Sequence, residues 1–138
     1  MKTPNIIKIV GGVVGAILSY LYGSADGWIT ALICMCVLDY LTGIAQAFVN
    51  KNLNSAVGFR GIAKKIVIFV VVAAANIVDN LIGANGVLRV AVIGFYFSNE
   101  SLSILENGGK IGVPYPQKLI DILSELKEDG NNGNAKRN

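Results

Sequence analysis

Four long apolar segments, separated by short polar breaks, constrain the fold of this chain more than any other feature. They run approximately over Ile6–Tyr22, Gly27–Val49, Ile62–Ile82 and Val87–Leu105. A bilayer core about 30 Å thick needs about 20 helical residues, with a range of about 17–25, so each segment is long enough to cross it. Backbone amides in lipid must be hydrogen-bonded within the segment, and these segments are too long for barrel strands. The pattern predicts an all-α integral membrane protein with about four transmembrane helices.

The first segment is the marginal one. It is short and glycine-rich, and it carries Lys8 near its start. If it lies at the membrane interface as a half-inserted helix, three spans remain. We expect it to be retained rather than removed as a signal peptide, because Tyr20 and Tyr22 are bulky where small residues precede a cleavage site. The composition supports the membrane assignment, since only 15% of the residues are charged, against about 25% in soluble domains.

Basic residues gather on one predicted side of the membrane. Four of them lie in or just after the break between the second and third segments, and no acidic residue occurs between Tyr40 and Val78. The breaks Gly23–Asp26 and Asn80–Gly86 contain no basic residue. By the positive-inside rule we expect both termini in the cytoplasm. The residues that set this topology are Lys51, Arg60, Lys64 and Lys65, with Lys2, Lys8, Lys110 and Lys118 in agreement.

A short amphipathic helix is predicted after the last span. Gly108 and Gly109, followed by Pro114 and Pro116, interrupt the helical pattern. Residues 117–128 resume it, with leucine and isoleucine on one face. The predicted organisation is a transmembrane bundle over 1–107, a cytoplasmic loop and amphipathic helix over 108–128, and a disordered polar tail over 129–138.

Polar residues inside the last three segments fall on one face of each predicted helix. Ionisable residues within membrane helices cost about 2.5–3.5 kcal/mol each on insertion scales, so they usually have a function. The faces contain, in the second segment, Asp39, Thr42, Gly43, Gln46 and Asn50; in the third, Lys65, Asn76, Asp79 and Gly83; and in the fourth, Arg89, Tyr96, Asn99, Glu100, Ser103 and Asn107. We expect Phe95, Leu102 and Leu105 on the opposite, lipid-compatible side of the fourth.

These polar faces allow two interpretations. They face one another in a dry bundle and hydrogen-bond across helices, with Asp39 either paired to Lys64 or Lys65 or protonated. Alternatively, they line water within one chain or in an oligomer. The two arrangements are compatible as successive states of one protein.

Small residues recur at four-residue spacing in the first segment, at Gly11, Gly15 and Ser19. Such spacing lets helices approach closely. Self-association and packing within the chain are both consistent with it.

The sequence contains no constellation typical of an enzyme. There is no histidine, and the only cysteines, Cys34 and Cys36, lie inside an apolar segment. Two cysteines on one helix make neither a zinc site nor a disulfide framework. We predict no catalytic site, no metal and no cofactor.

Several motifs resemble the toxin-secretion/phage-lysis holin family of Gram-positive hosts. The sequence Asp39-Tyr40-Leu41-Thr42-Gly43 ends a span, and Lys64-Lys65 follows in the next. The most specific stretch runs from Asn99-Glu100 through Glu106-Asn107, and Gly112-Val113-Pro114-Tyr115-Pro116 comes after it. The resemblance covers approximately residues 31–126.

The resemblance implies a holin, a protein that oligomerises in the host cytoplasmic membrane and opens lesions at a set time. Such lesions let an endolysin reach the cell wall without direct contact, and related members release toxins. The implied partners are therefore other copies of the chain and the lipid bilayer, and no nucleic acid. The family-motif residues carried over are Asp39, Thr42, Gly43, Lys64, Lys65, Asn99, Glu100, Glu106 and Asn107.

Two other functions remain open from the sequence. A small constitutive ion channel or transporter would use the same polar-lined bundle. A structural or regulatory membrane protein would dock through the C-terminal helix.

Overall fold

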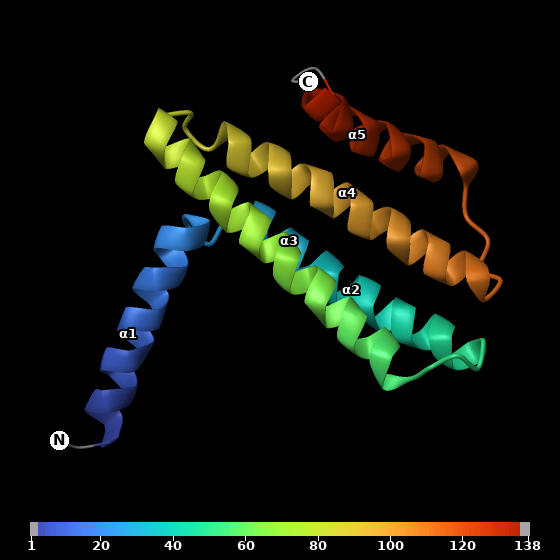
Figure 1. The fold of residues 1–138 in the computed structure, drawn as a ribbon, viewed down its shortest axis with the longest axis horizontal. Helices are drawn as coiled ribbons and strands as arrows, with labels where there is room; N and C mark the ends of the chain where they lie inside the picture. The colour runs from blue at the N-terminus through green and yellow to red at the C-terminus, as the bar shows by residue number, and fades with distance from the viewer. Residues whose placement is uncertain (1–2, 136–138) are drawn as a thin grey trace.

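The computed structural model describes residues 3–135, and over that range the chain is all-helical. Figure 1 shows α2, α3 and α4 running alongside one another, with α1 leaning away at one end and α5 lying along the outer side of α4. The helices are α1 (Thr3–Tyr22), α2 (Gly27–Val49), α3 (Ser55–Ile82), α4 (Val87–Lys110) and α5 (Gln117–Ala135). The predicted fold class, a helical membrane protein with a C-terminal helix, is confirmed.

Three of these helices are long and apolar enough to cross a membrane: α1 over Asn5–Tyr22, α2 and α3. The first segment, which the sequence marked as marginal, therefore qualifies as a membrane span by length and composition. Among the four predicted spans, the most polar is α4. It carries Arg89, Glu100, Glu106 and Lys110, and partners within the bundle must compensate their charges if α4 crosses lipid.

Side-chain caps determine where α2 and α3 begin. Asp26 accepts a hydrogen bond from the Ile29 N–H at 3.1 Å, and Asn54 accepts one from the Val57 N–H at 3.0 Å. Such caps satisfy backbone donors that have no partner within the helix. Because of the Asn54 cap, α3 begins at Ser55, earlier than the apolar pattern predicted. Three of the four topology residues therefore lie on α3, and only Lys51 lies in the loop.

The last two helices both run further than expected. Helix α4 continues through Gly108 and Gly109 to Lys110, and the chain turns at Gly112, where φ is +91°. Helix α5 extends to Ala135, so residues 129–135 are helical where we expected disorder. That stretch contains no proline, so the backbone hydrogen bonding of the preceding turns can continue through it. Residues 136–138 lie outside the described residues.

The buried apolar core is small and lies between α2, α3 and α4. It consists of Ile29, Leu32, Cys36, Ile68, Val72 and Ile93. Most other large apolar side chains are exposed. Exposure of this extent suits a protein surrounded by lipid.

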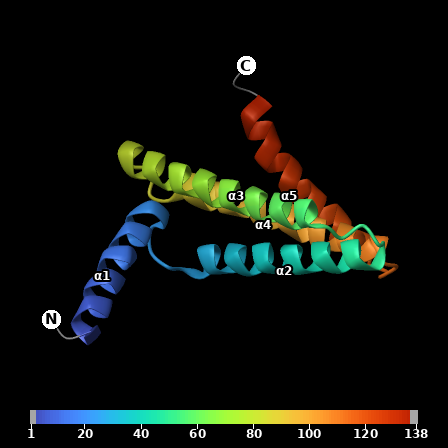
Figure 2. The ribbon, with the colours of Figure 1, turned by 60° about the horizontal axis from the view of Figure 1, so that its bottom comes forward.

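Helix α1 makes little contact with the rest of the chain, and every residue from Asn5 to Tyr20 is exposed. Figure 2 shows it diverging from α2 and α3. Beyond the helix's own backbone, no described atom lies within 4 Å of a Cβ built on Gly11 or Gly15. Gly15 and Ser19 line the open groove between α1 and the bundle. Packing within the chain leaves this small-residue face unoccupied, and self-association through it remains a prediction.

Candidate functional site

The polar residues of the three bundle helices meet in two clusters. The first, called the Lys65 cluster, consists of Asp39, Thr42, Lys65, Glu100 and Asn107. The second, called the Arg89 cluster, consists of Asp26, Asn76, Asp79 and Arg89. Both join residues that are more than 60 positions apart in the sequence, and both lie where helices pack together.

Lys65 joins the three bundle helices through two ion pairs. Its Nζ donates to Oδ2 of Asp39 on α2 and to Oε2 of Glu100 on α4. Asp39 is 8% exposed, and Glu100 is fully buried. A buried carboxylate without a counter-charge would be strongly destabilising, so the shared ammonium is what allows both to lie in the bundle.

Asn107 and Thr42 complete the hydrogen bonding around Asp39. Asn107 Nδ2 donates to Asp39 Oδ1 at 3.3 Å and to Thr42 Oγ1 at 3.1 Å. The Thr42 hydroxyl donates to the Asp39 carbonyl oxygen at 3.0 Å. Gly43 lies next to Asn107, whose Nδ2 is 3.6 Å from the position that a Cβ would take. Both carboxylate oxygens of Asp39 therefore have donors, from α3 and from α4.

The hydrogen bonding of the Glu100 carboxylate is less complete than that of Asp39. Its Oε1 is buried and has no hydrogen-bond partner among the described residues. A second cation, the Nζ of Lys64, lies 3.6 Å from this oxygen on a side chain that is 49% exposed. A cavity of about 200 Å³ with a mixed polar and apolar lining adjoins the cluster, and Asp39, Gln46, Lys65 and Ser103 are among its polar residues. The volume and these polar side chains suit a few water molecules.

Arg89 holds the turn between α1 and α2. Its guanidinium donates to Asp26 at 2.8 and 3.2 Å, to the Tyr22 carbonyl at 2.6 Å and to the Ser24 carbonyl at 3.2 Å. Arg89 is only 6% exposed. This bidentate contact with Arg89 lowers the pKa of the Asp26 carboxyl, and the Ile29 N–H acts in the same direction against the opposing effect of desolvation.

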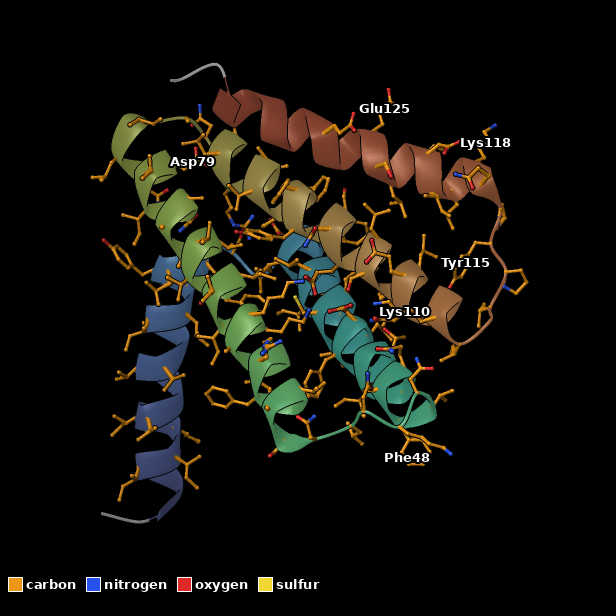
Figure 3. The ribbon with its side chains drawn as sticks, turned by 45° about the vertical axis from the view of Figure 1, so that its right-hand side comes forward. Phe48, Asp79, Lys110, Tyr115, Lys118 and Glu125 are labelled. Atoms are coloured by element: carbon orange, nitrogen blue, oxygen red, sulfur yellow. The ribbon has the colours of Figure 1, made fainter. Side chains whose placement is uncertain are left out.

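Two further contacts fix this end of the bundle. Asp79, at the end of α3 beside the start of α4 (Figure 3), accepts from the Arg89 N–H at 2.7 Å and from the Gly86 N–H at 3.2 Å. A carboxylate here compensates the positive end of the α4 dipole. Asn76 donates to the Tyr20 carbonyl at 3.1 Å. Gly23 has φ +73°, and a Cβ there would lie 3.2 Å from Asn76 Oδ1, so the turn requires glycine.

The polar faces predicted from the sequence do meet one another in this structure. Asp39 pairs with Lys65, one of the two lysines that the sequence left open. Gln46 and Ser103 line the cavity beside the Lys65 cluster, while Asn99 and Tyr96 are half-buried and Glu106 is exposed. The expected lipid side of α4 was wrong for Leu102, which is buried. Leu102 and Leu105 line a groove that α5 shares with α4.

Sequence reasoning missed the role of Asp26, which it treated only as an acidic loop residue. Its position directly before an apolar helix is the signal for a helix cap. Its pairing with Arg89 joins residues too far apart in sequence for any local pattern to show. Among the described residues, no group of three or more histidine, cysteine or acidic side chains is arranged to hold a metal ion.

Residues 16–128 match the sequence profile of the bacteriophage holin family. The chain is 35% identical over 111 residues to a probable holin of Bacillus phage phi105, covering 80% of this chain and 82% of that protein. It is 41% identical over 109 residues to an uncharacterized protein of Listeria monocytogenes, and the match covers 79% of this chain and 78% of that protein. An uncharacterized protein of Clostridium perfringens is 40% identical over 130 residues, and the match covers 91% of this chain and 96% of that protein. No solved structure matches the chain.

Proposed function

Because this chain belongs to the bacteriophage holin family, we propose that it oligomerises in the bacterial cytoplasmic membrane and opens lesions that time host-cell lysis. An endolysin, or a toxin in a secretion role, would cross through these lesions without binding the chain directly. The holin family is non-enzymatic. We accordingly assign no catalytic residue, no cofactor and no nucleic-acid partner.

The observation that best supports this proposal is the burial of charge between α2, α3 and α4. Asp39, Glu100 and Arg89 are each less than 10% exposed, and all are paired within the chain. Paired inward, these groups are tolerated in a lipid bilayer. Separation of the helices in a larger assembly would turn the same groups toward water and give a polar wall. A protein with this property is harmless while dispersed and permeable once assembled.

We also propose that both termini and the α2–α3 loop face the cytoplasm. The basic residues Lys51, Arg60 and Lys64 near that loop support this orientation. A variant without Cys34 and Cys36 would carry a single cysteine at Lys51 or at Asn85. A membrane-impermeant thiol reagent added to intact cells should label the cysteine at 85 and leave the one at 51 unlabelled. The reverse labelling would refute the orientation.

Lysis itself is tested by expressing the full chain in a bacterium with and without a cytoplasmic endolysin. We expect optical density to fall abruptly, after a delay, only when the endolysin is present. A protein-sized cytoplasmic reporter should appear in the medium at the same moment. A graded, ion-selective conductance without endolysin release would instead identify the alternative function, a small constitutive channel or transporter.

A further inference from the structure

A shallow groove between α3 and α4 combines cationic and apolar residues. Its volume is about 420 Å³, and it is lined by Arg60, Ala63, Lys64, Val67, Ile68 and Tyr96. Arg60 and Lys64 are four residues apart on α3, so their side chains share one face of that helix. Both cations lie at the end of the groove nearest the α2–α3 loop.

The two cations are available to a ligand. Arg60 is exposed and makes no hydrogen bond or ion pair with another described residue. Lys64 is half-exposed, and its one recorded ion pair, with Glu100 at 3.6 Å, is longer than a hydrogen bond. The sequence from Leu41 to Val78 contains no acidic residue, and the Glu100 side chain is fully buried. An anion at this end of the groove would therefore meet positive charge without exposed negative charge from α3.

The remainder of the groove is apolar. Val67 is 59% exposed and lies seven residues beyond Arg60, about 10 Å along the helix axis. Ile68 is buried beneath it, and the half-buried Tyr96 of α4 forms the opposite wall. A phosphate group bound at Arg60 and Lys64 would thus have room for an attached hydrocarbon chain directly below it.

We propose that this groove binds an anionic phospholipid from the leaflet nearest the α2–α3 loop. The phosphate lies between Arg60 and Lys64, and one acyl chain lies along Val67 and Tyr96. Basic grooves at the ends of membrane helices recognise anionic headgroups in this way. The proposal requires that the chain lie in a membrane, but it is independent of lesion formation. If the chain fails to cause lysis, the lipid-binding proposal is therefore not contradicted.

The test uses the full chain reconstituted in phosphatidylcholine vesicles. Electron paramagnetic resonance compares how strongly spin-labelled phosphatidylglycerol and spin-labelled phosphatidylcholine associate with the protein. We expect the wild type to prefer phosphatidylglycerol, and Arg60→Gln or Lys64→Gln to reduce that preference by up to about fivefold each. The double variant should show no preference. An equal association of both lipids with the wild type would overturn the proposal.

Three matched variants separate the groove from general surface charge and from misfolding. Lys110→Gln with Lys118→Gln removes the same net charge outside the groove and should leave the preference intact. Val67→Trp fills the groove without changing charge and should abolish it. Arg60→Lys with Lys64→Arg keeps both cations and should retain it. An equal loss in the Lys110/Lys118 variant, or an unchanged preference in Val67→Trp, would show diffuse electrostatic attraction and refute the site.

Discussion

Lys65 of α3 and Glu100 of α4 form an ion pair in which the Glu100 side chain is fully buried. The same ammonium also binds Asp39 of α2, so a single cation connects three helices. Lys64, the neighbouring residue, is turned by about 100° around the helix axis and remains half-exposed. Two adjacent lysines therefore have different roles, one inside the bundle and one at its surface.

Removing the buried lysine should destabilise the bundle strongly. Lys65→Met leaves Asp39 and Glu100 without their shared cation, and breaking a buried pair in this way costs about 3–5 kcal/mol. Lys64→Met removes only a long, partly exposed ion pair and should cost about 1 kcal/mol or less. Denaturant unfolding in detergent, followed by circular dichroism, measures both. Restored stability on adding Asp39→Asn and Glu100→Gln to Lys65→Met would confirm the cause, and equal losses for the two lysines would contradict it.

Neutralising Asp39 should advance lysis. Asp39→Asn keeps the size of the side chain but removes one of the two charges that hold Lys65, so α2 separates more easily from α3 and α4. Induced lysis in the presence of endolysin should begin earlier, as measured by optical density. Leu41→Val, at a residue that is 56% exposed on the same helix, is the matched control. Identical onset times for both variants would exclude a role for the Lys65 cluster in timing.

Enlarging the small-residue face of α1 should weaken self-association. Gly15→Leu places a bulky side chain in the open groove beside α1, where no described atom outside the helix's own backbone lies within 4 Å of the added Cβ, so the fold of the chain should be preserved. The dimer fraction measured by cross-linking in membranes should correspond to roughly tenfold weaker association, a loss of about 1.4 kcal/mol. Val13→Leu enlarges another exposed position of α1. If both substitutions act equally, the small-residue face is not the contact.

Acidification should loosen the turn between α1 and α2. The pKa of Asp26 is lowered in the folded chain by Arg89, so this pairing stabilises the fold above the ordinary carboxyl pKa of about 3.9. That stabilisation disappears as the pH falls below this value toward the lowered pKa. Trp28 is the only tryptophan and lies two residues from Asp26. In the wild type its fluorescence should change as the pH is lowered below about 4, and Asp26→Asn should abolish this transition.

The sequence predicts the helices well because their signals are local. Apolar length identifies the four long helices, and the 100° spacing places Asp39, Glu100 and Asn107 on inward faces. The start of α3 is missed because the Asn54 cap extends the helix beyond its apolar part. Helix caps are also local signals, and Asn54 directly before Ser55 marks this boundary in the sequence.

Relationships between helices are less predictable. Whether Lys64 or Lys65 reaches Asp39 depends on how three helices cross, and periodicity does not determine that angle. The Arg89–Asp26 pair bridges residues on either side of two complete helices. The burial of Leu102 depends on α5 returning along α4, which follows from the turn at Gly112 rather than from the pattern of α4 itself.

Helix α4 carries members of both clusters, Arg89 near its start and Glu100 further along. Eleven residues separate them, which is about 16 Å along the axis but only about 20° around it. A rotation of α4 about its own axis would therefore withdraw both side chains from their partners in the same movement. If α4 rotates as one helix, the two ends of the bundle are released together rather than one after the other.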